Sequence, residues 1–112
     1  MIKKIRITAD SVIKGYRYAK IVMVDYSILD PAWSQSVYNH SPDGFNWGYG
    51  GSGPAQLALA LLLLCAGEKE ALEHYQDFKN DIVSRLTDDD FVLSGSDIIT
   101  WMEDNSEDEE KE

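Results

Sequence analysis

Residues 39–54 read NHSPDGFNWGYGGSGP and continue without a break into AQLALALLLL at 55–64. Five of the chain's eight glycines lie in the first of these two segments, beside one phenylalanine, one tryptophan and one tyrosine. Glycine is favoured where the backbone φ must be positive or where another part of the chain comes close, so this density indicates a loop of defined shape. The apolar run that follows predicts a helix inside the core.

The junction of the two segments contains residues that are typical of the start of a helix. Pro54 suits the first turn of a helix, and Ser52 or Gly53 before it can cap the exposed amides. We predict a helix from Pro54 to about Ala66, ended by Gly67 in the left-handed conformation. Leucines surround this helix almost completely, which in a small domain indicates a central helix covered on several sides.

The segment before the loop has the composition of β-strands. Apolar and polar residues alternate over Lys4–Thr8, and Tyr18–Leu29 is rich in β-branched and aromatic residues. These two stretches predict antiparallel strands with Lys14-Gly15 as turn material between them, and Asp30-Pro31 should end the second strand. Ser36–Tyr38 predicts a short third strand.

The segment after the central helix predicts two more helices. Over residues 68–86 apolar side chains recur at steps of three and four, which indicates an amphipathic helix with one wet face. Phe91–Leu93 should pack back on the core, and Ser94–Asp97 offers a cap for a short C-terminal helix. The predicted fold class is α+β, with a small N-terminal antiparallel sheet of two to three strands packed by the central, amphipathic and C-terminal helices.

Length and charge indicate one domain and an acidic tail. The chain has 112 residues and a formal net charge of −10, and we assign residues 1–102 to a single α+β domain. Residues 103–112 contain seven acidic side chains, one basic side chain and no apolar one, which predicts a disordered acidic tail. The lone Cys65 allows no disulfide within the chain and favours a reducing cytoplasm. No secretory signal or membrane-length apolar run is visible, so we expect a soluble cytoplasmic protein.

The loop and the two helices after it carry a family resemblance. Residues 39–62, together with Tyr75-Gln76-Asp77-Phe78-Lys79, resemble a family of bacterial and phage proteins known as domain of unknown function 6166. The resemblance covers the middle of the chain, whereas the N-terminal strands match only in character. It implies a small protein often encoded by phages, plasmids and their hosts, and it implies no activity and no catalytic roles.

The loop is the candidate site for a ligand or a partner. Consecutive amides from Gly50 to Gly53 at a helix N-terminus can attract a phosphate, and a base could stack on Trp47 or Tyr49. The loop lacks the Lys-Ser/Thr ending of a P-loop. In the structural interpretation, the glycines let the loop fold tightly while Phe45 and Trp47 fill the core. The candidate ligand-binding or partner-binding residues are Asn39, His40, Trp47, Tyr49, Gly50, Gly51, Ser52 and Gly53.

Catalysis and metal binding have weaker signals. His40 could act as a general base near neutral pH, which leaves a hydrolase or transferase as an alternative. The preferred interpretation is that His40 pins the loop through hydrogen bonds, with Asn39 and Ser41 as local partners. Two histidines and one cysteine without paired spacing predict no metal site and no cofactor.

The charge pattern bears on the class of partner. An acidic chain repels phosphate backbones, so nucleic-acid binding would depend on one small basic patch, formed by Lys3, Lys4, Arg6, Lys14, Arg17 and Lys20. The second helix carries an acidic exterior that could meet a basic protein, formed by Glu68, Glu70, Glu73, Asp77 and Asp81.

These observations lead to two functional hypotheses. The first is a small non-enzymatic interaction protein, a phage or mobile-element accessory that interferes with a host system through its glycine- and aromatic-rich loop and its acidic surface. The alternative is a binder of a nucleotide or another phosphate-containing small ligand at the start of the central helix.

Overall fold

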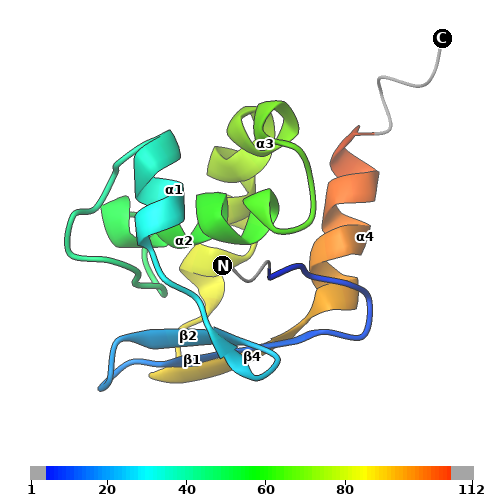
Figure 1. The fold of residues 1–112 in the computed structure, drawn as a ribbon. Coiled ribbons are helices and arrows are strands. Elements are labelled where there is room, and N and C mark those ends of the chain that lie inside the picture. Colours follow the sequence, from blue (N-terminus) through cyan, green and yellow to red (C-terminus); the bar gives the residue numbers. More distant parts are fainter. Residues whose placement is uncertain (1–4, 107–112) are drawn as a thin grey trace, which may run out of the picture.

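The computed structural model describes residues 5–106, which form a sheet with a layer of helices on one side (Figure 1). The strands of the sheet are β1 Val12–Tyr16, β2 Ile21–Val24, β3 Ser27–Ile28 and β4 Asp90–Ser94. The helices are α1 Ala32–Val37, α2 Ser52–Leu63, α3 Glu68–Asp81 and α4 Gly95–Ser106, with a 3₁₀ turn η1 at Val83–Arg85. The α+β fold class is therefore confirmed.

The sheet is antiparallel throughout, with the strand order β3-β2-β1-β4. Strand β4 returns from the C-terminal part of the chain to pair with β1, so the sheet has four strands rather than the two or three predicted. Side chains alternate between the two faces of a strand. Ile13, Val22 and Phe91 are buried on the helical side, whereas Lys14 and Val92 are exposed on the other side, which we call the open face.

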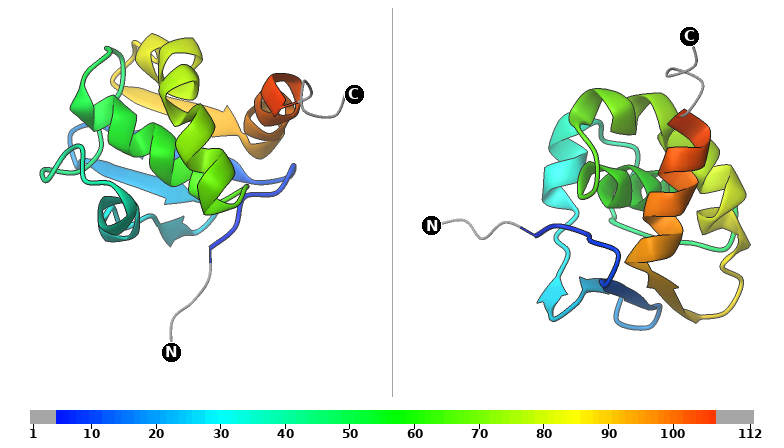
Figure 2. Two further views of the ribbon diagram at one scale, coloured as in Figure 1. Left: turned by 90° about the horizontal axis from the view of Figure 1, so that it is seen from above. Right: turned by 90° about the vertical axis from the view of Figure 1, so that its right-hand side faces the viewer.

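Helix α2 occupies the centre of the domain, as predicted. Every residue from Gly53 to Leu63 is buried. Figure 2 shows why, because α2 crosses above the sheet with α1 on one side and α3 on the other. None of the helices within residues 5–106 has the length and apolarity needed to cross a bilayer.

The first predicted strand and the turn after it were wrong. In the described part of Lys4–Thr8 the chain is extended but has no strand neighbour, and the Ile7 amide donates to the Leu64 carbonyl at 3.1 Å. Lys14-Gly15, predicted as a turn, lies within β1. Gly15 is required there because a Cβ atom would overlap the Phe91 ring on the neighbouring strand.

The predicted second strand is two strands, and the predicted third strand is a helix. A turn at Asp25-Tyr26 separates β2 from β3, with Asp25 at a φ of +56°. Ser36 and Val37 lie in α1, which begins just after Asp30-Pro31. The Asp30 carboxylate accepts the Ala32 amide at 2.9 Å, so the residues that end the strand also start the helix.

Several helix ends also differ from the prediction. Gly51, not Ser52 or Gly53, is the N-cap of α2. Gly67 has a φ of −72° and precedes α3, so it is not a left-handed terminator. The amphipathic helix ends at Asp81 and a 3₁₀ turn continues toward Leu86.

The C-terminal helix is longer than predicted. The Ser94 hydroxyl accepts the Asp97 amide at 3.0 Å, which confirms the predicted cap. Helix α4 then continues to Ser106, so residues 103–106 are helical although the prediction placed them in the tail. Residues 107–112 lie outside the described part of the chain.

Candidate functional site

The aromatic residues of the loop divide into buried and exposed ones. Phe45 is 7% exposed and Trp47 is 1% exposed, so both fill the core as the structural interpretation predicted. Trp47 packs edge-on against Phe91 with ring centroids 4.8 Å apart, and its Nε1 donates to the Asp89 carbonyl at 3.1 Å. The prediction that Trp47 offers its ring to a ligand or partner was wrong. Tyr49, by contrast, is 49% exposed.

Arg17 ties the loop to the sheet. This residue follows β1 and donates from Nη1 to the Asn46 side chain at 2.7 Å and from Nη2 to the Trp47 carbonyl at 3.1 Å. Its guanidinium carbon lies 5.1 Å from the centre of the Trp47 ring, and its Nε lies 3.3 Å from an Asp89 carboxylate oxygen. Arg17 is thus bound internally and does not belong to a free basic patch. Of that predicted patch, Lys3 and Lys4 lie outside the described residues.

Two of the loop glycines are needed for close contact between chain segments. Gly48 has a φ of +88°, and a Cβ atom there would come within 2.9 Å of the Leu86 carbonyl oxygen. A Cβ atom at Gly53 would come within 2.7 Å of the Asn46 Cβ. The Gly48 amide also donates to the Val83 carbonyl at 3.0 Å. Packing of the chain, rather than approach of a ligand, explains these two positions.

Gln56 fixes the first part of the loop from within α2. It is completely buried, and its side-chain oxygen accepts the amides of His40 and Ser41 at 2.7 and 2.9 Å. Its Nε2 donates to the Ser34 hydroxyl at 3.0 Å and to the Tyr38 carbonyl at 3.1 Å. A buried amide with all of these groups paired holds a segment in one geometry.

His40 makes contacts that differ from those predicted. Its ring stacks on Tyr38 with centroids 4.3 Å apart and planes inclined by 7°, and its Nε2 is hydrogen-bonded to the Tyr75 hydroxyl at 2.5 Å. Neither Asn39 nor Ser41, the expected partners, bonds to the ring. Burial, and secondly the charge of Lys79, hold the pKa of His40 below its ordinary value of 6.5. His40 pins the loop as expected, but through Tyr75 and its own backbone amide.

Four side chains at the surface of this region are exposed or partly exposed, and we call them the loop patch: Tyr38, His40, Tyr49 and Lys79. Tyr38 is 55% exposed and carries the His40 ring on one face. The Lys79 ammonium lies 3.5 Å from the Gly50 carbonyl, next to Tyr49 in the chain, and close enough to His40 to lower its pKa. The patch therefore combines two half-exposed phenols, an imidazole and one cation.

Sequence reasoning missed Tyr38, Tyr75 and Lys79 as members of this region. Tyr38 was assigned to a strand, and the other two were treated only as parts of an amphipathic helix. The spacing of Tyr75 and Lys79, four residues apart on one helix face, was the available signal. Asn39 and Ser52, two further candidate contact residues, are exposed at the surface.

The start of α2 offers little to a phosphate. Pro54 has no amide hydrogen, and the Ala55 amide donates to the Gly51 carbonyl at 3.1 Å. The amides of Ser52 and Gly53 remain, with Lys79 as the neighbouring cation. Three of the pockets in the described part of the chain have volumes of about 540, 480 and 720 Å³, and no residue of 39–53 lines any of these three.

The environment of His40 does not resemble a hydrolase site. Within residues 5–106 its ring is hydrogen-bonded to the Tyr75 phenol, with no serine, cysteine or carboxylate as a partner. In the same residues no three His, Cys, Asp or Glu side chains are grouped to hold a metal ion. Burial raises the pKa of Cys65 to about 11, which keeps its thiol protonated near neutral pH.

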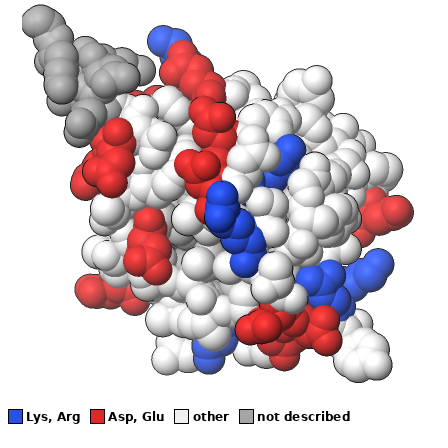
Figure 3. Space-filling view, turned by 180° about the vertical axis from the view of Figure 1, so that it is seen from behind, with Lys and Arg blue, Asp and Glu red and all other residues white. Residues whose placement is uncertain are grey.

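The acidic side chains of α3 are exposed, as predicted. Figure 3 shows red acidic groups spread over one side of the molecule with blue basic groups among them. One of the acidic residues, Asp81, accepts the Trp101 indole hydrogen at 2.8 Å and so also links α3 to α4.

Comparisons with known proteins were made for the whole chain. Neither the search of curated proteins nor the search of solved structures finds a match. The model of the family of unknown function DUF6166 matches residues 13–104, from the second residue of β1, through the loop and the first three helices, to near the end of α4. The chain therefore belongs to the DUF6166 family of unknown function.

Proposed function

We propose that this domain is a small non-enzymatic binding protein and that the loop patch is its contact surface for a protein partner. One observation supports this most directly: a loop with little freedom holds Tyr38 and Tyr49 about half exposed. Tyrosine is enriched at protein interfaces because it provides large contact area with little loss of side-chain entropy. A fixed loop further reduces the entropy lost on binding.

The proposal extends to the class of partner. The chain carries a formal net charge of −10, which favours association with a basic protein. The resemblance to phage and plasmid proteins suggests a wider role, and we propose an accessory protein that interferes with a host system. The acidic exterior of α3 would contribute to the rate of association rather than to the specific contact.

A pair of double variants tests the proposal. Tyr38→Ala/Tyr49→Ala removes both phenols of the loop patch, while Tyr18→Ala/Tyr26→Ala removes two tyrosines that are 105% and 98% exposed in turns of the sheet. The tagged wild-type protein would first capture a partner from a bacterial extract. The purified partner would then be titrated by calorimetry into the wild type and into both double variants. We expect the first double variant to lose about 2 kcal/mol or more of binding free energy and the second to lose little. Equal losses, or no loss in the first, would contradict the proposal.

A phosphate-bearing small ligand is the second candidate, and one observation favours it. Lys79 lies beside Gly50 at the start of α2, where the Ser52 and Gly53 amides carry partial positive charge. Titration of ATP and of inorganic phosphate, followed by amide NMR shifts, would test this. Binding should move the Ser52 and Gly53 signals and weaken in Lys79→Met but not in Lys69→Met, a lysine exposed elsewhere on α3. A flat response to both compounds removes this candidate.

A further inference from the structure

Within residues 5–106, strand β4 pairs with β1 on one side and with no strand on its other, outer edge. Two hydrogen bonds show which way the backbone groups of β1 point. The Val12 carbonyl accepts the amide of Asp25, the residue after β2, and the Ser11 carbonyl accepts the amide of Gly95, the residue after β4. The backbone N–H and C=O groups of successive residues in a strand point to opposite sides. The even-numbered residues of β1 therefore form their hydrogen bonds with β2, and the odd-numbered residues form theirs with β4. In the register of Ile13 with Leu93, the odd-numbered residues of β4 face β1. The backbone groups of residues 90, 92 and 94 consequently point away from the sheet.

This edge lacks the usual protection. Natural sheets block exposed edges with proline, lysine, bulges or a covering segment. Strand β4 reads DFVLS, with no proline, no lysine and one charged residue, Asp90 at its start, and Val92 is 67% exposed. The opposite edge of the sheet is the two-residue β3, which is too short to pair with a long segment.

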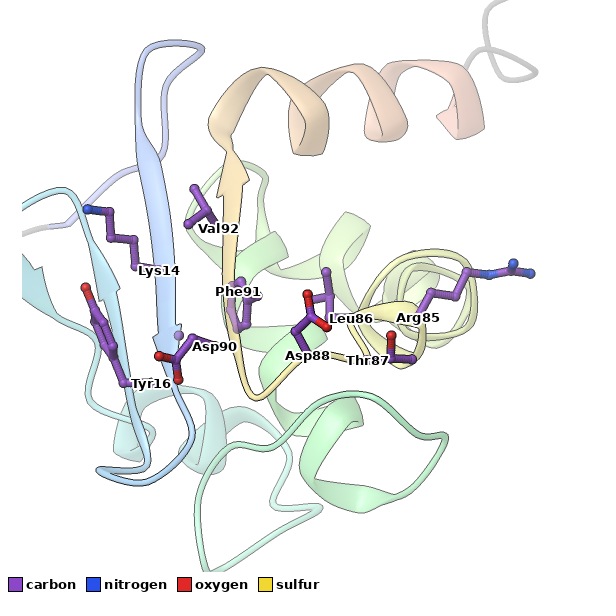
Figure 4. Close-up of a pocket in the computed structure, with 10 residues that line it drawn as sticks. Lys14, Tyr16, Arg85, Leu86, Thr87, Asp88, Asp90, Phe91 and Val92 are labelled. Atoms are coloured by element: carbon purple, nitrogen blue, oxygen red, sulfur yellow. The ribbon is translucent and has the colours of Figure 1, made fainter.

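A groove of about 540 Å³ runs beside this edge. Its walls are residues 14–16 of β1, residues 90–92 of β4 and the segment 85–88 that leads into β4. Figure 4 shows Asp90 and Val92 on the side of Lys14, and Leu86 and Asp88 on the other side of β4. Residues 90–92 of β4 thus line a space that extends from β1 on one side of the strand to residues 85–88 on the other.

The charges at the groove favour a basic occupant. Asp88 and Asp90 are both exposed on its border, and one carboxylate oxygen of Asp90 accepts the Arg17 backbone amide at 3.2 Å. Asp89 is paired with the Arg17 side chain at 3.3 Å. The Arg85 side chain extends away from β4 in Figure 4, and its Nε donates to the Asn80 carbonyl at 3.4 Å. Lys14 lies one strand further from the edge, opposite Val92. A cation placed beside Asp90 on a new strand would be nearer to that carboxylate than to Lys14.

We propose that β4 binds an extended segment of a basic partner protein by strand addition, which makes that segment the fifth strand of the sheet. Strand addition takes its affinity from main-chain hydrogen bonds and its specificity from alternate side chains. On the open face the bound segment places a lysine or arginine beside Asp90 and a β-branched residue beside Val92. This surface is distinct from the loop patch, and the inference does not depend on the function proposed for that patch.

The direct test uses a hexapeptide that meets this description. In antiparallel pairing, Thr-Val-Thr-Val-Thr-Lys places its second valine opposite Val92 and its lysine opposite Asp90. Titration into ¹⁵N-labelled full-length protein should shift the amide signals of residues 90, 92 and 94 more than those of the loop patch. A peptide with glutamate in place of the lysine should bind several-fold more weakly.

Backbone methylation separates strand addition from simple charge attraction. An N-methyl group on the second valine removes the hydrogen that would bond to β4, whereas an N-methyl group on the neighbouring threonine removes one that points to solvent. The first modification should weaken binding about tenfold and the second should change it little. Equal effects of the two modifications would overturn the proposal. This comparison leaves the protein itself unchanged.

A protein variant provides the reciprocal comparison. Val92→Pro removes the outward amide hydrogen but no bond to β1, and Val92→Thr keeps that hydrogen. Loss of peptide binding in the first and retention in the second is the expected result. The proposal falls if no shift is seen at residues 90–94. It also falls if the protein forms a dimer that Val92→Pro disrupts, because the occupant is then a second copy. Shifts confined to Tyr38 and Tyr49 would overturn the strand-addition proposal while leaving the proposed function intact.

Discussion

The glycine-rich loop and strand β4 differ in opposite ways from what their sequences suggest. The sequence predicts a loop of defined shape that offers Trp47 and Tyr49 for contact. The shape is held by hydrogen bonds with Gln56 and Arg17, but Trp47 is buried in the core. Strand β4 looks in the sequence like an ordinary apolar segment, yet among residues 5–106 no strand lies beside its outer backbone groups. Whether a segment can bind a partner therefore depends on which of its groups the fold leaves exposed and unpaired, and the composition of the segment alone does not reveal this.

The largest expected effect concerns the buried side of the loop. Trp47→Ala should lower the free energy of unfolding by about 3 to 5 kcal/mol, because it removes a fully buried indole and leaves a cavity against Phe91. Tyr49→Ala, at a half-exposed ring in the same loop, should cost no more than about 0.5 kcal/mol. Urea denaturation of both variants measures the difference. Similar losses of unfolding free energy in the two variants would contradict the division of the loop aromatics into a buried Trp47 and an exposed Tyr49.

A smaller loss is expected when the loop is released from α2. Gln56→Leu keeps the size of the side chain but leaves the buried Ser41 amide and other polar groups near it without partners. We expect a loss of about 2 to 4 kcal/mol, at about 1 to 2 kcal/mol for each of at least two groups. Gln76→Leu, at an exposed position of α3, is the matched control and should change stability little. A neutral Gln56→Leu substitution would mean that packing alone shapes this segment.

The smallest effect concerns the pH dependence contributed by His40. Burial and Lys79 lower its pKa in the folded protein, so near pH 6.5 and below the unfolded chain binds more protons than the folded one. The contribution of neutral His40 to the stability of the fold is therefore complete above the pKa of the unfolded chain. It decreases as the pH falls toward the lower pKa of His40 in the folded protein. On acidification from about pH 7.5 to about pH 5.5, Tm should therefore fall less in His40→Gln than in the wild type. A fall of the same size in both proteins would show that His40 does not contribute.

The sequence was sufficient for the features that depend on local pattern. The apolar run predicted α2, and steps of three and four predicted α3, because both signals lie within one element. The β-sheet was harder to predict, because it pairs strands that lie far apart in the sequence. The need for glycine at position 15, for example, comes from the Phe91 ring on β4. The Asp30-Pro31 signal was read as a strand end, although the same pair is a helix-start signal and α1 follows it.

The candidate site was predictable in position but not in its members. Glycine density located the loop, but the same density is compatible with ligand approach or with close packing of the chain. Only the contacts of Gly48 and Gly53 distinguish these two readings. Tyr75 and Lys79 join the region through tertiary packing of α3, which no spacing within the loop could reveal.

Amide hydrogen exchange of the native protein, measured by NMR, tests the contrast between the loop and β4 most directly. Bonded amides exchange only when the structure opens, whereas unpaired exposed ones exchange freely. We predict that the amides of Ser41 and Gly48 in the loop are protected. The Val92 amide, in the middle of β4, should exchange rapidly between protected neighbours at Phe91 and Leu93. Protection of Val92 equal to that of Leu93, or fast exchange at Ser41 and Gly48, would contradict the account.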